Sequence, residues 1–365
     1  MKLFLLGFLN YVQGTKWQLN RALRAQAAGS VSEKKALEVL EKYGFGSLSE
    51  QEKAEMVRDM LECATKRHYM FSEYFMYRFY ERSDEERFKF GSFYWATICY
   101  SQLNRARNRP IFDVKYYTAK KFAKYFKRET IAICTRFDRK KLARFLERHG
   151  SVIVKPMSSL AGRDVDIFTL GANEDANELA SKLIAQYCKG RKCAIVEELV
   201  EQDERMKVLH PQSVNTLRVV TIRLNDRVVI FHPRVRVGRG GSVVDNCGKG
   251  GIMGLLDPET GVVEKAEDEM GNSFTIHPDT QVPIVGFQVP EYDKAIALAK
   301  ELATVVPSNR LTGWDLALST KGWVLIEANR NPSWFHQMTS QIGCKEEVKG
   351  YLREIGITDK RTMNE

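Results

Sequence analysis

The stretch GWDLALSTKGWVLIEANRNPSW, residues 313–334, consists of two short apolar runs joined at Thr320-Lys321-Gly322. This pattern predicts a β-hairpin. Asp315 interrupts the first run, and Glu327 and Asn329 close the second. If the runs pair, Asp315 and Glu327 lie on neighbouring strands, and Glu327 and Asn329 share one face. Two carboxylates and an amide are oxygen donors that suit Mg²⁺. The alternative is a structural hairpin whose edge carboxylates pair with arginine or lysine.

The composition is that of a soluble globular protein. The chain has 365 residues, 44% of them apolar and 28% charged, which excludes a disordered or fibrous protein and allows two domains or one large multi-lobed enzyme. No apolar run reaches the roughly 18 residues of a membrane span. The opening MKLFLLGFLNYVQG lacks a cleavage site and is interpreted as a first helix rather than a signal peptide.

The net charge of +10 implies attraction to an anionic partner, such as a nucleotide, an acidic polysaccharide or an anionic membrane face. No nucleic-acid-binding module is recognisable, so nucleic acid is not expected as a partner. The seven cysteines are odd in number and scattered, without a CxxC pair, which indicates reduced thiols in a cytoplasm and no structural zinc site. Cys247, in a glycine-rich loop, is the one cysteine that we single out as a candidate for a functional role.

The pattern divides the chain into four segments. Residues 1–108 are expected to be helical, with a capping box of Ser49 and Glu52 opening a helix that runs to residue 81. Its aromatic end is expected to pack on another domain rather than to stack on bases or sugars. Strands and helices alternate in 109–200, as in an α/β unit. Residues 201–345 are rich in strands, with a hairpin turn at Asn225-Asp226, and a helix and tail follow in 346–365.

Two strand ends carry further candidate residues. Lys155 ends the apolar strand 151–156 and is followed by the small-residue loop 157–164, in which backbone N–H groups can approach phosphate oxygens. The loop is not a P-loop, because GxxxxGK[ST] is missing. Glu197 and Glu198 end the strand 193–200, where they are either solvated or accept hydrogen bonds from an adenine amine and ribose hydroxyls.

Arginines alternate along the two strands that follow. Arg218 lies in the first, and Arg234 and Arg236 share a face of the second, where they can present forked donors to a γ-phosphate or a substrate carboxylate. Surface arginines on an antiparallel sheet are the equal alternative for each of the three. His336 is expected to be a packed histidine of an aromatic cluster rather than a base.

The segments VIVKP, IVEELV, VNTLRVVT and DNCGKGGI, together with the hairpin, resemble the ATP-grasp superfamily and its sugar-transfer-associated branch. The resemblance covers residues 110–345 approximately, and the helical N-terminal part also looks like that branch. It implies an α+β fold in which two α/β lobes sandwich ATP, with 109–200 as the N-lobe and 201–345 as the C-lobe carrying the metal site.

The resemblance also implies roles for individual residues. Asp315, Glu327 and Asn329 match the family's metal ligands, and Lys155 matches the lysine on the α- and β-phosphates. The second phosphate lysine corresponds to Lys115, with Lys120 and Lys121 as rivals. The remaining nucleotide contacts fall on the small-residue loop and the adenine hinge: Ser158, Ser159, Gly162, Glu197, Glu198 and Leu199. At Asp164 many members have a further glycine.

The implied activity is that of a carboxylate–amine ligase that uses ATP and Mg²⁺. Such an enzyme makes an acyl phosphate from a small-molecule or saccharide carboxylate, and an amine then displaces phosphate; here a sugar acid or surface-polysaccharide component is the expected acceptor. Arg218, Arg234 and Arg236 would neutralise charge, and Asn246 and Lys249 would lie on a lid over the transferred phosphate. A kinase that phosphorylates a sugar-like hydroxyl is the alternative, and a non-catalytic polyanion-binding protein is a more distant one. The enzyme is expected in the cytoplasm.

Overall fold

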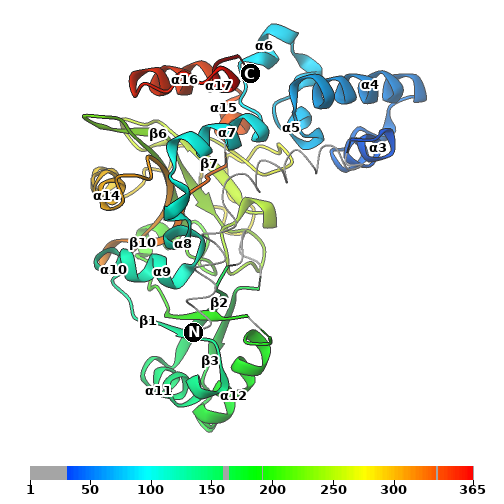
Figure 1. The fold of residues 1–365 in the computed structure, drawn as a ribbon. Helices are drawn as coiled ribbons and strands as arrows, with labels where there is room; N and C mark the ends of the chain where they lie inside the picture. Colours follow the sequence, from blue (N-terminus) through cyan, green and yellow to red (C-terminus); the bar gives the residue numbers. More distant parts are fainter. Residues whose placement is uncertain (1–30, 159–163, 191, 334–335, 365) are drawn as a thin grey trace.

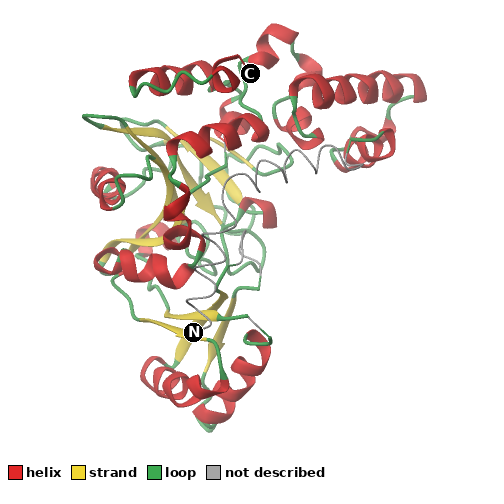
Figure 2. Ribbon diagram, in the orientation of Figure 1, coloured by secondary structure: helices red, strands yellow, loops and turns green. Residues whose placement is uncertain are grey.

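A computed structural model describes residues 31–158, 164–190, 192–333 and 336–364. The molecule is elongated, with a helical part at one end, a six-stranded sheet in the middle and a smaller four-stranded sheet at the other end (Figure 1). Helices pack against both sheets (Figure 2), and every strand pairing in both sheets is antiparallel. The expected α+β class is confirmed.

The N-terminal part is built from short helices. They are α3 (Glu33–Lys42), α4 (Glu50–Arg67), α5 (Phe71–Met76) and α6 (Asp84–Phe88), with the 3₁₀ turns η2 (Phe45–Ser47) and η3 (Phe79–Glu81). The predicted capping box is present, since Ser49 Oγ accepts from Glu52 N and a Glu52 carboxylate oxygen accepts from Ser49 N at 2.9 Å. The predicted opening helix lies outside the described residues.

The single long helix predicted up to residue 81 is wrong. Helix α4 ends at Arg67, because His68 takes a left-handed conformation with φ of 59° and turns the chain away. The aromatic residues that follow do not reach another domain as a group. They pack mainly on α3, α4 and one another, in a cluster that includes Tyr69, Tyr74, Phe75 and Phe79.

The smaller sheet has the strand order β1-β4-β2-β3. Its strands are β1 (Thr130–Ile133), β2 (Ser151–Pro156), β3 (Asp166–Thr169) and β4 (Ala194–Glu198). Helices α11 (Arg139–His149) and α12 (Ala176–Tyr187) pack side by side and bury the apolar side chains of this sheet, in the lobe at the bottom of Figure 1. The four strands and two helices predicted between residues 130 and 200 are therefore present.

One pair of thiols corrects the expectation of reduced cysteines. Cys134, just after β1, and Cys193, just before β4, form a disulfide, with their Cα atoms 4.3 Å apart. The pairing follows from the antiparallel register of β1 and β4, in which Ile133 lies opposite Ala194. The five other cysteines, Cys63, Cys99, Cys188, Cys247 and Cys344, are not part of a disulfide.

The larger sheet has the order β10-β9-β5-β6-β7-β8. Its strands are β5 (Thr216–Arg223), β6 (Val228–Val237), β7 (Ile252–Leu256), β8 (Val263–Glu267), β9 (Leu311–Ser319) and β10 (Gly322–Asn329). Both predicted hairpins form, β5–β6 around Asn225-Asp226 and β9–β10 around the turn before Gly322. The second hairpin places Asp315 on the interior strand β9, and Glu327 and Asn329 on β10, the edge strand beside it.

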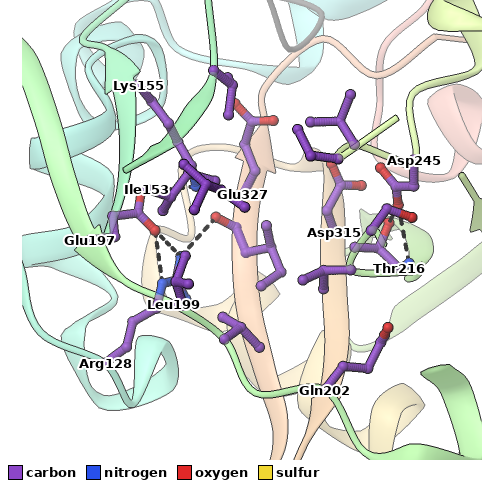
Figure 3. Close-up of a pocket in the computed structure, with 18 of the residues that line it drawn as sticks. Arg128, Ile153, Lys155, Glu197, Leu199, Gln202, Thr216, Asp245, Asp315 and Glu327 are labelled. Atoms are coloured by element: carbon purple, nitrogen blue, oxygen red, sulfur yellow. Dashed lines mark hydrogen bonds and ion pairs between the residues drawn. The ribbon is translucent and has the colours of Figure 1, made fainter. Parts of the chain in front are cut away.

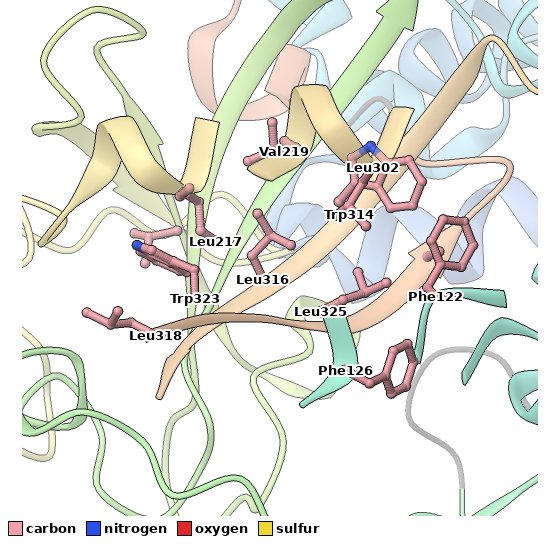
Figure 4. Close-up of a cluster of buried hydrophobic side chains, with 14 of the residues drawn as sticks. Phe122, Phe126, Leu217, Val219, Leu302, Trp314, Leu316, Leu318, Trp323 and Leu325 are labelled. Atoms are coloured by element: carbon pink, nitrogen blue, oxygen red, sulfur yellow. The ribbon is translucent and has the colours of Figure 1, made fainter. Parts of the chain in front are cut away.

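The two faces of the larger sheet differ. One face is apolar and carries Leu217, Trp314 and Leu316, which pack on α14 (Tyr292–Val305) and on the aromatic rings of Phe122 and Phe126 (Figure 4). These two rings belong to the short helices that precede the small lobe. They are α8 (Arg109–Asp113), α9 (Lys115–Lys121) and α10 (Ala123–Phe126), after the 3₁₀ turn η4 (Ala106–Asn108).

The opposite face is covered at one end and open at the other. Helices α7 (Phe93–Leu103) and α16 (Lys345–Glu354) pack over Val220, Ile222 and Phe231, whereas the other end of the face carries charged side chains. Helix α7 thus packs on the sheet, although the predicted boundary at residue 108 would group it with the N-terminal helices.

The remaining elements are η5 (Arg136–Asp138), α13 (Glu204–Lys207), η6 (Cys247–Lys249), α15 (His336–Ser340) and α17 (Lys360–Asn364). Among the helices of the described segments, none has both the length and the apolarity that crossing a bilayer requires.

Candidate active site

A pocket of roughly 380 Å³ lies between the two sheets, within the range of small-molecule sites. Strands β2 and β4 of the small lobe form one side of the pocket, β9 and β10 of the large sheet face them, and Thr216 and Asp245 lie beyond β9 (Figure 3). The predicted site residues that line it are Lys115, Lys155, Glu197, Glu198, Leu199, Arg236, Asn246, Asp315 and Glu327. The sequence placed these residues on separate segments, and the fold brings them around one cavity.

Five predicted residues are described but do not line this pocket: Ser158, Arg218, Arg234, Lys249 and Asn329. Ser158 is exposed in the turn after β2, while Arg218 and Asn329 reach the site through Asp315. Ser159 and Gly162 lie outside the described residues. Asp164, at the end of the same loop, has φ of 54°, a conformation that glycine adopts most readily and that aspartate tolerates.

The charged face of the large sheet forms a continuous row. Glu327, Asp315, Arg218 and Arg234 are successive cross-strand partners on β10, β9, β5 and β6. Cross-strand partners point to the same face, so the predicted adjacency of Asp315 and Glu327 is confirmed. Asn329 follows on the same side, with its amide Nδ2 3.2 Å from Asp315 Oδ2.

Asp315 lies between two arginines. Arg218 donates two hydrogen bonds to its carboxylate, and Arg236 Nη1 donates to Asp315 Oδ2 at 3.0 Å. Burial opposes ionisation of Asp315, but the charges of Arg218 and Arg236 outweigh it and lower its pKa to about 2. The residue is therefore a carboxylate at any physiological pH.

Arg234 is the most deeply buried arginine of the row, with 2% of its surface exposed. Its Nη2 donates to Ser333 O at 3.0 Å, and its Nη1 has no hydrogen-bond partner among the described residues. Burial, reinforced by the like charges of Arg218 and Arg236, lowers the pKa of Arg234 to about 9. A buried cation with an unused donor is suited to an anionic ligand.

Lys115 is the pocket lysine among the three candidates. Its Nζ lies 2.7 Å from Glu327 Oε1, and the residue lines the pocket. Lys120 instead lies over the ring of Tyr116, 5.4 Å from its centroid, and Lys121 is exposed. The geometry favours Lys115 over its two rivals.

Lys155 and Glu197 face each other on β2 and β4. Lys155 Nζ lies 3.1 Å from Glu197 Oε1, and Arg128 Nη2 lies 2.7 Å from Glu197 Oε2. Burial lowers the pKa of Lys155, and Glu197 partly offsets this effect. Burial disfavours the Glu197 carboxylate, but Arg128 and Lys155 outweigh it and bring its pKa to about 2. The Glu197 carboxylate thus holds the side chain of Lys155 in position and is not a solvated group at the edge of the pocket.

Family comparison decides what kind of site this is. The family model described as sugar-transfer-associated ATP-grasp matches residues 96–352. The chain belongs to the sugar-transfer-associated ATP-grasp family. No curated protein sequence matches the chain.

The solved structures that match the chain do so at low similarity. D-alanyl-alanine synthetase A from Vibrio cholerae O1 biovar eltor str. N16961 is 13% identical over 71% of this chain and 65% of that chain, with a TM-score of 0.40. D-cycloserine synthetase DcsG is 15% identical over 80% and 82%, with a TM-score of 0.40. The ATP-grasp ligase PsnB, solved with a minimal precursor, Mg and ADP, is 15% identical over 69% and 62%, with a TM-score of 0.39. The chain thus spans less than two thirds of the first of these proteins.

ATP and Mg²⁺ are the cofactors of ATP-grasp proteins, and the pocket residues fit both. Asp315, Glu327 and Asn329 offer two carboxylates and an amide on one face, and oxygen donors are what Mg²⁺ prefers. No group of three His, Cys, Asp or Glu side chains able to hold a metal occurs in the described segments, so the amide and ligand oxygens would have to complete the coordination. Lys115 and Lys155 would face the phosphates.

The alternative interpretation, a purely structural hairpin whose carboxylates pair with arginine or lysine, is only partly supported. Asp315 and Glu327 do pair with cations, as that alternative expects. These ion pairs, however, face a pocket between two lobes and not the solvated edge of a sheet. An ATP-grasp site needs cations and carboxylates together, because both phosphates and metal must be neutralised.

The adenine hinge residues occupy the expected strand end. Glu198 lies at the end of β4, where it accepts from Glu129 N at 3.0 Å and pairs with Lys321 at 3.0 Å, and Leu199 follows it in the pocket lining. The Glu198 side chain is thus engaged by protein groups. The backbone after it is the part of the hinge that faces the pocket.

The glycine-rich loop 238–251 folds against the same pocket. Asn246 lines the pocket and caps η6, with its Oδ1 accepting from Gly248 N at 3.0 Å. Lys249 is exposed at the end of η6. Cys247 is buried, and burial raises the pKa of its thiol to about 12, so it is not a reactive thiolate.

His336 is packed, as expected. Its ring stacks on His232 with centroids 4.4 Å apart and meets Phe231 edge-on. Burial keeps its pKa well below the usual value. A neutral histidine in an aromatic cluster is a structural group.

Arg128 and Asp245 are among the pocket residues that were not predicted from the sequence. Arg128 pairs with Glu197 and donates to Leu325 O at 2.7 Å, thereby linking the two lobes. Asp245 accepts from Thr216 and pairs with Arg236. The position of Asp245 beside Asn246 in a glycine-rich loop could have indicated that it belongs to the site. Arg128 gave no such indication, because it lies in a basic stretch that resembled a solvated helix face.

Proposed function

We propose that this protein is an ATP- and Mg²⁺-dependent carboxylate–amine ligase that acts through an acyl phosphate. The observation that carries the proposal is that Lys115, Lys155, Asp315 and Glu327 all line one pocket. Lysines can bind phosphate oxygens and the carboxylates can hold the metal, so the nucleotide would lie between the lobes. The domain boundaries at residues 108, 200 and 345 belong to the same proposal.

The reaction has two steps. An oxygen of the substrate carboxylate forms a bond to the γ-phosphorus of ATP, and ADP leaves. The nitrogen of the amine then forms a bond to the acyl carbon, phosphate leaves with that oxygen, and the amine loses a proton to solvent. No covalent bond to the protein is needed, so positioning and charge neutralisation are its main contributions.

The arginines of the sheet supply that neutralisation. Arg234 has a buried donor without a hydrogen-bond partner among the described residues, and Arg236 reaches the pocket itself. Both lie on β6, two strands away from Asp315, near which the carboxylate and the transferred phosphoryl group would meet. Forked guanidinium donors match carboxylate and phosphate oxygens.

The acceptor that we propose is a sugar acid or a surface-polysaccharide component, joined to an amino acid or another amine. The family's description supports this choice, and the net charge of +10 favours an anionic substrate. We further propose a cytoplasmic location, because the reaction consumes ATP. The Cys134–Cys193 disulfide would be an uncommon feature there.

The test is a screen of uronic acids and amino acids for phosphate release from ATP with Mg²⁺. A ligase releases phosphate only when both a carboxylate and an amine are present, and mass spectrometry shows the amide. With an ¹⁸O-labelled carboxylate, one label appears in the released phosphate. A phosphorylated acceptor without free phosphate would instead identify a kinase and overturn the ligase.

A further inference from the structure

Asp245 is a buried carboxylate that the proposed chemistry does not use. We propose that Asp245 is a positioning residue that acts through Arg236 and keeps this arginine from fully neutralising the metal-binding carboxylate Asp315. The proposal rests on the proposed function for the metal role of Asp315. It assigns to the glycine-rich loop a direct influence on metal binding.

Asp245 is held firmly on both sides. Its Oδ2 accepts from Thr216 N at 3.1 Å and from the Thr216 hydroxyl, and its Oδ1 lies 3.1 Å from Arg236 Nη2. Only 8% of the residue is exposed. The two ends of this loop segment also pack closely together. A Cβ atom added to Gly251 would lie only 2.8 Å from the backbone oxygen of Asp245. The carboxylate therefore has a defined position relative to the sheet.

Arg236 is shared between two carboxylates. Its Nη1 donates to Asp315 Oδ2 at 3.0 Å while its Nη2 faces Asp245 Oδ1. The three side chains are each at least 87% buried, since 10%, 13% and 4% of Asp245, Arg236 and Asp315 are exposed. In such a site one guanidinium charge is divided between two anions, with little screening by water.

The sharing matters because Asp315 has a second cation. Arg218 already donates to both oxygens of Asp315. If Asp245 lost its charge, Arg236 would lose one of its two carboxylate contacts and keep the one with Asp315. A divalent cation would then compete with two arginines for one carboxylate, and its affinity would fall.

The loop position makes Asp245 a link between two parts of the site. Its neighbours Val243, Val244 and Asn246 line the pocket, and Arg236 and Asp315 belong to the sheet beneath. Contact between Asp245 and Arg236 is thus a contact between the loop that covers the pocket and the row that holds the metal.

The experiment measures Mg²⁺-dependent binding of AMP-PNP, a non-hydrolysable ATP analogue, by the full chain. D245N keeps the side-chain shape but removes the charge. R236K keeps the charge, but a single ammonium cannot reproduce the two-sided guanidinium contact. D257N is the matched control, because Asp257 likewise accepts from the N–H and hydroxyl of one threonine, Thr260, at 2.7 and 2.9 Å but lies outside the pocket lining.

We expect D245N to raise the Mg²⁺ concentration for half-maximal AMP-PNP binding about tenfold. R236K alone should not raise it, because one ammonium competes with the metal for Asp315 less than the two-sided guanidinium does. In the R236K background D245N should have a smaller effect than in the wild-type background, because the guanidinium through which Asp245 acts is absent. D257N should match the wild type. Binding of AMP-PNP without Mg²⁺ should stay unchanged in D245N, which a general loosening of the loop would not allow.

The proposal is overturned if D245N requires the same Mg²⁺ concentration as the wild type, or if D245N raises the required concentration by the same factor in the R236K background as in the wild-type background. Amide synthesis by the wild type is measured in parallel. A wild type that binds Mg²⁺ with AMP-PNP but makes no amide would overturn the ligase alone, and the double-variant comparison would still decide the role of Asp245. A wild type that binds no nucleotide would overturn both.

Discussion

Lys115 and Glu327, 212 positions apart in the chain, form an ion pair with Nζ and Oε1 2.7 Å apart. The pair joins helix α9 to the metal-site strand β10 within the pocket. In the nucleotide-bound enzyme that we propose, the lysine would face phosphate and the carboxylate would face the metal. The pair thus marks the point where phosphate and metal would meet.

The first prediction concerns the choice among three lysines. Lys115→Ala should weaken ATP binding about tenfold or more, since a charge-assisted hydrogen bond to phosphate contributes roughly 1.5–3 kcal/mol. Isothermal titration calorimetry measures the change. Lys120→Ala is the control, because that side chain lies over Tyr116 and does not line the pocket. Equal losses for both variants would remove Lys115 from its role.

The second prediction concerns the metal carboxylate. Asp315→Asn should reduce turnover by about a hundredfold or more, because one hard ligand to Mg²⁺ is lost and Arg218 and Arg236 lose their counter-ion. Steady-state phosphate release measures the loss, and circular dichroism checks the fold. Glu264→Gln, an exposed carboxylate on β8 of the same sheet, should behave as the wild type. Full activity of Asp315→Asn would contradict the metal site.

The third prediction is a pH dependence of stability from Glu197. Its pKa is about 2 in the folded protein and near 4.5 ordinarily. Because the folded value is lower, this contribution is present above pH 4.5 and is lost as the pH falls toward 2. Each pKa unit corresponds to about 1.4 kcal/mol, so the contribution is about 3 kcal/mol. At pH 3 about 2 kcal/mol of this contribution is lost, and urea unfolding at pH 6 and pH 3 measures that difference.

Glu197→Gln provides the comparison for that measurement. The variant should be less stable at pH 6, because Arg128 and Lys155 keep their charges in a buried site without the anion. Its loss of stability between pH 6 and pH 3 should be smaller than that of the wild type. Parallel pH profiles for the two proteins would show that Glu197 is not held ionised.

The hairpin was predictable because its evidence is local. Alternating apolar residues fixed the strands, and the turn at Thr320-Lys321-Gly322 fixed the pairing next to it. A register shift between Leu325 and Glu327, which the sequence did not show, then sets Asp315 opposite Glu327. Arg128 was not predictable in this way, because its partners Glu197 and Leu325 are 69 and 197 positions away. The residues around Arg128 in the sequence do not indicate which distant strands its side chain will contact.

The helix break and the disulfide were missed for related reasons. His68 ends α4 without a glycine or proline, so the helical pattern continued past the true end. Cys134 and Cys193 are 59 positions apart, and only the antiparallel register of β1 and β4 brings them together. Local periodicity predicts elements well, whereas contacts between elements depend on topology.

The fourth prediction concerns Glu73, a carboxylate in the helical part with 4% of its surface exposed. It accepts from Met70 N at 2.8 Å and Phe93 N at 2.7 Å, and burial raises its pKa to about 7. The folded value is the higher one, so stability from this group is present below pH 4.5 and is lost as the pH rises through 7. Urea unfolding should show a decrease of up to about 3 kcal/mol from pH 5 to pH 8.

Glu73→Gln separates this group from other titrations. Glutamine stays neutral at every pH, so the decrease between pH 5 and pH 8 should be largely absent from the variant. At pH 5 the variant should be slightly less stable than the wild type, because an amide oxygen and an amide nitrogen cannot both accept from Met70 N and Phe93 N. An equal decrease in both proteins would assign the effect to another residue.

The last prediction concerns the glycine-rich loop. Lys249→Ala should lower turnover about tenfold while leaving ATP affinity within about twofold, because an exposed lysine on the covering loop can reach the transferred phosphoryl group only when the substrates are in place. Turnover and nucleotide affinity are measured separately. Lys294→Ala, an exposed lysine on α14 paired with Glu291, is the control. If Lys249→Ala keeps full turnover, the loop covers the pocket without supplying a charge to the reaction.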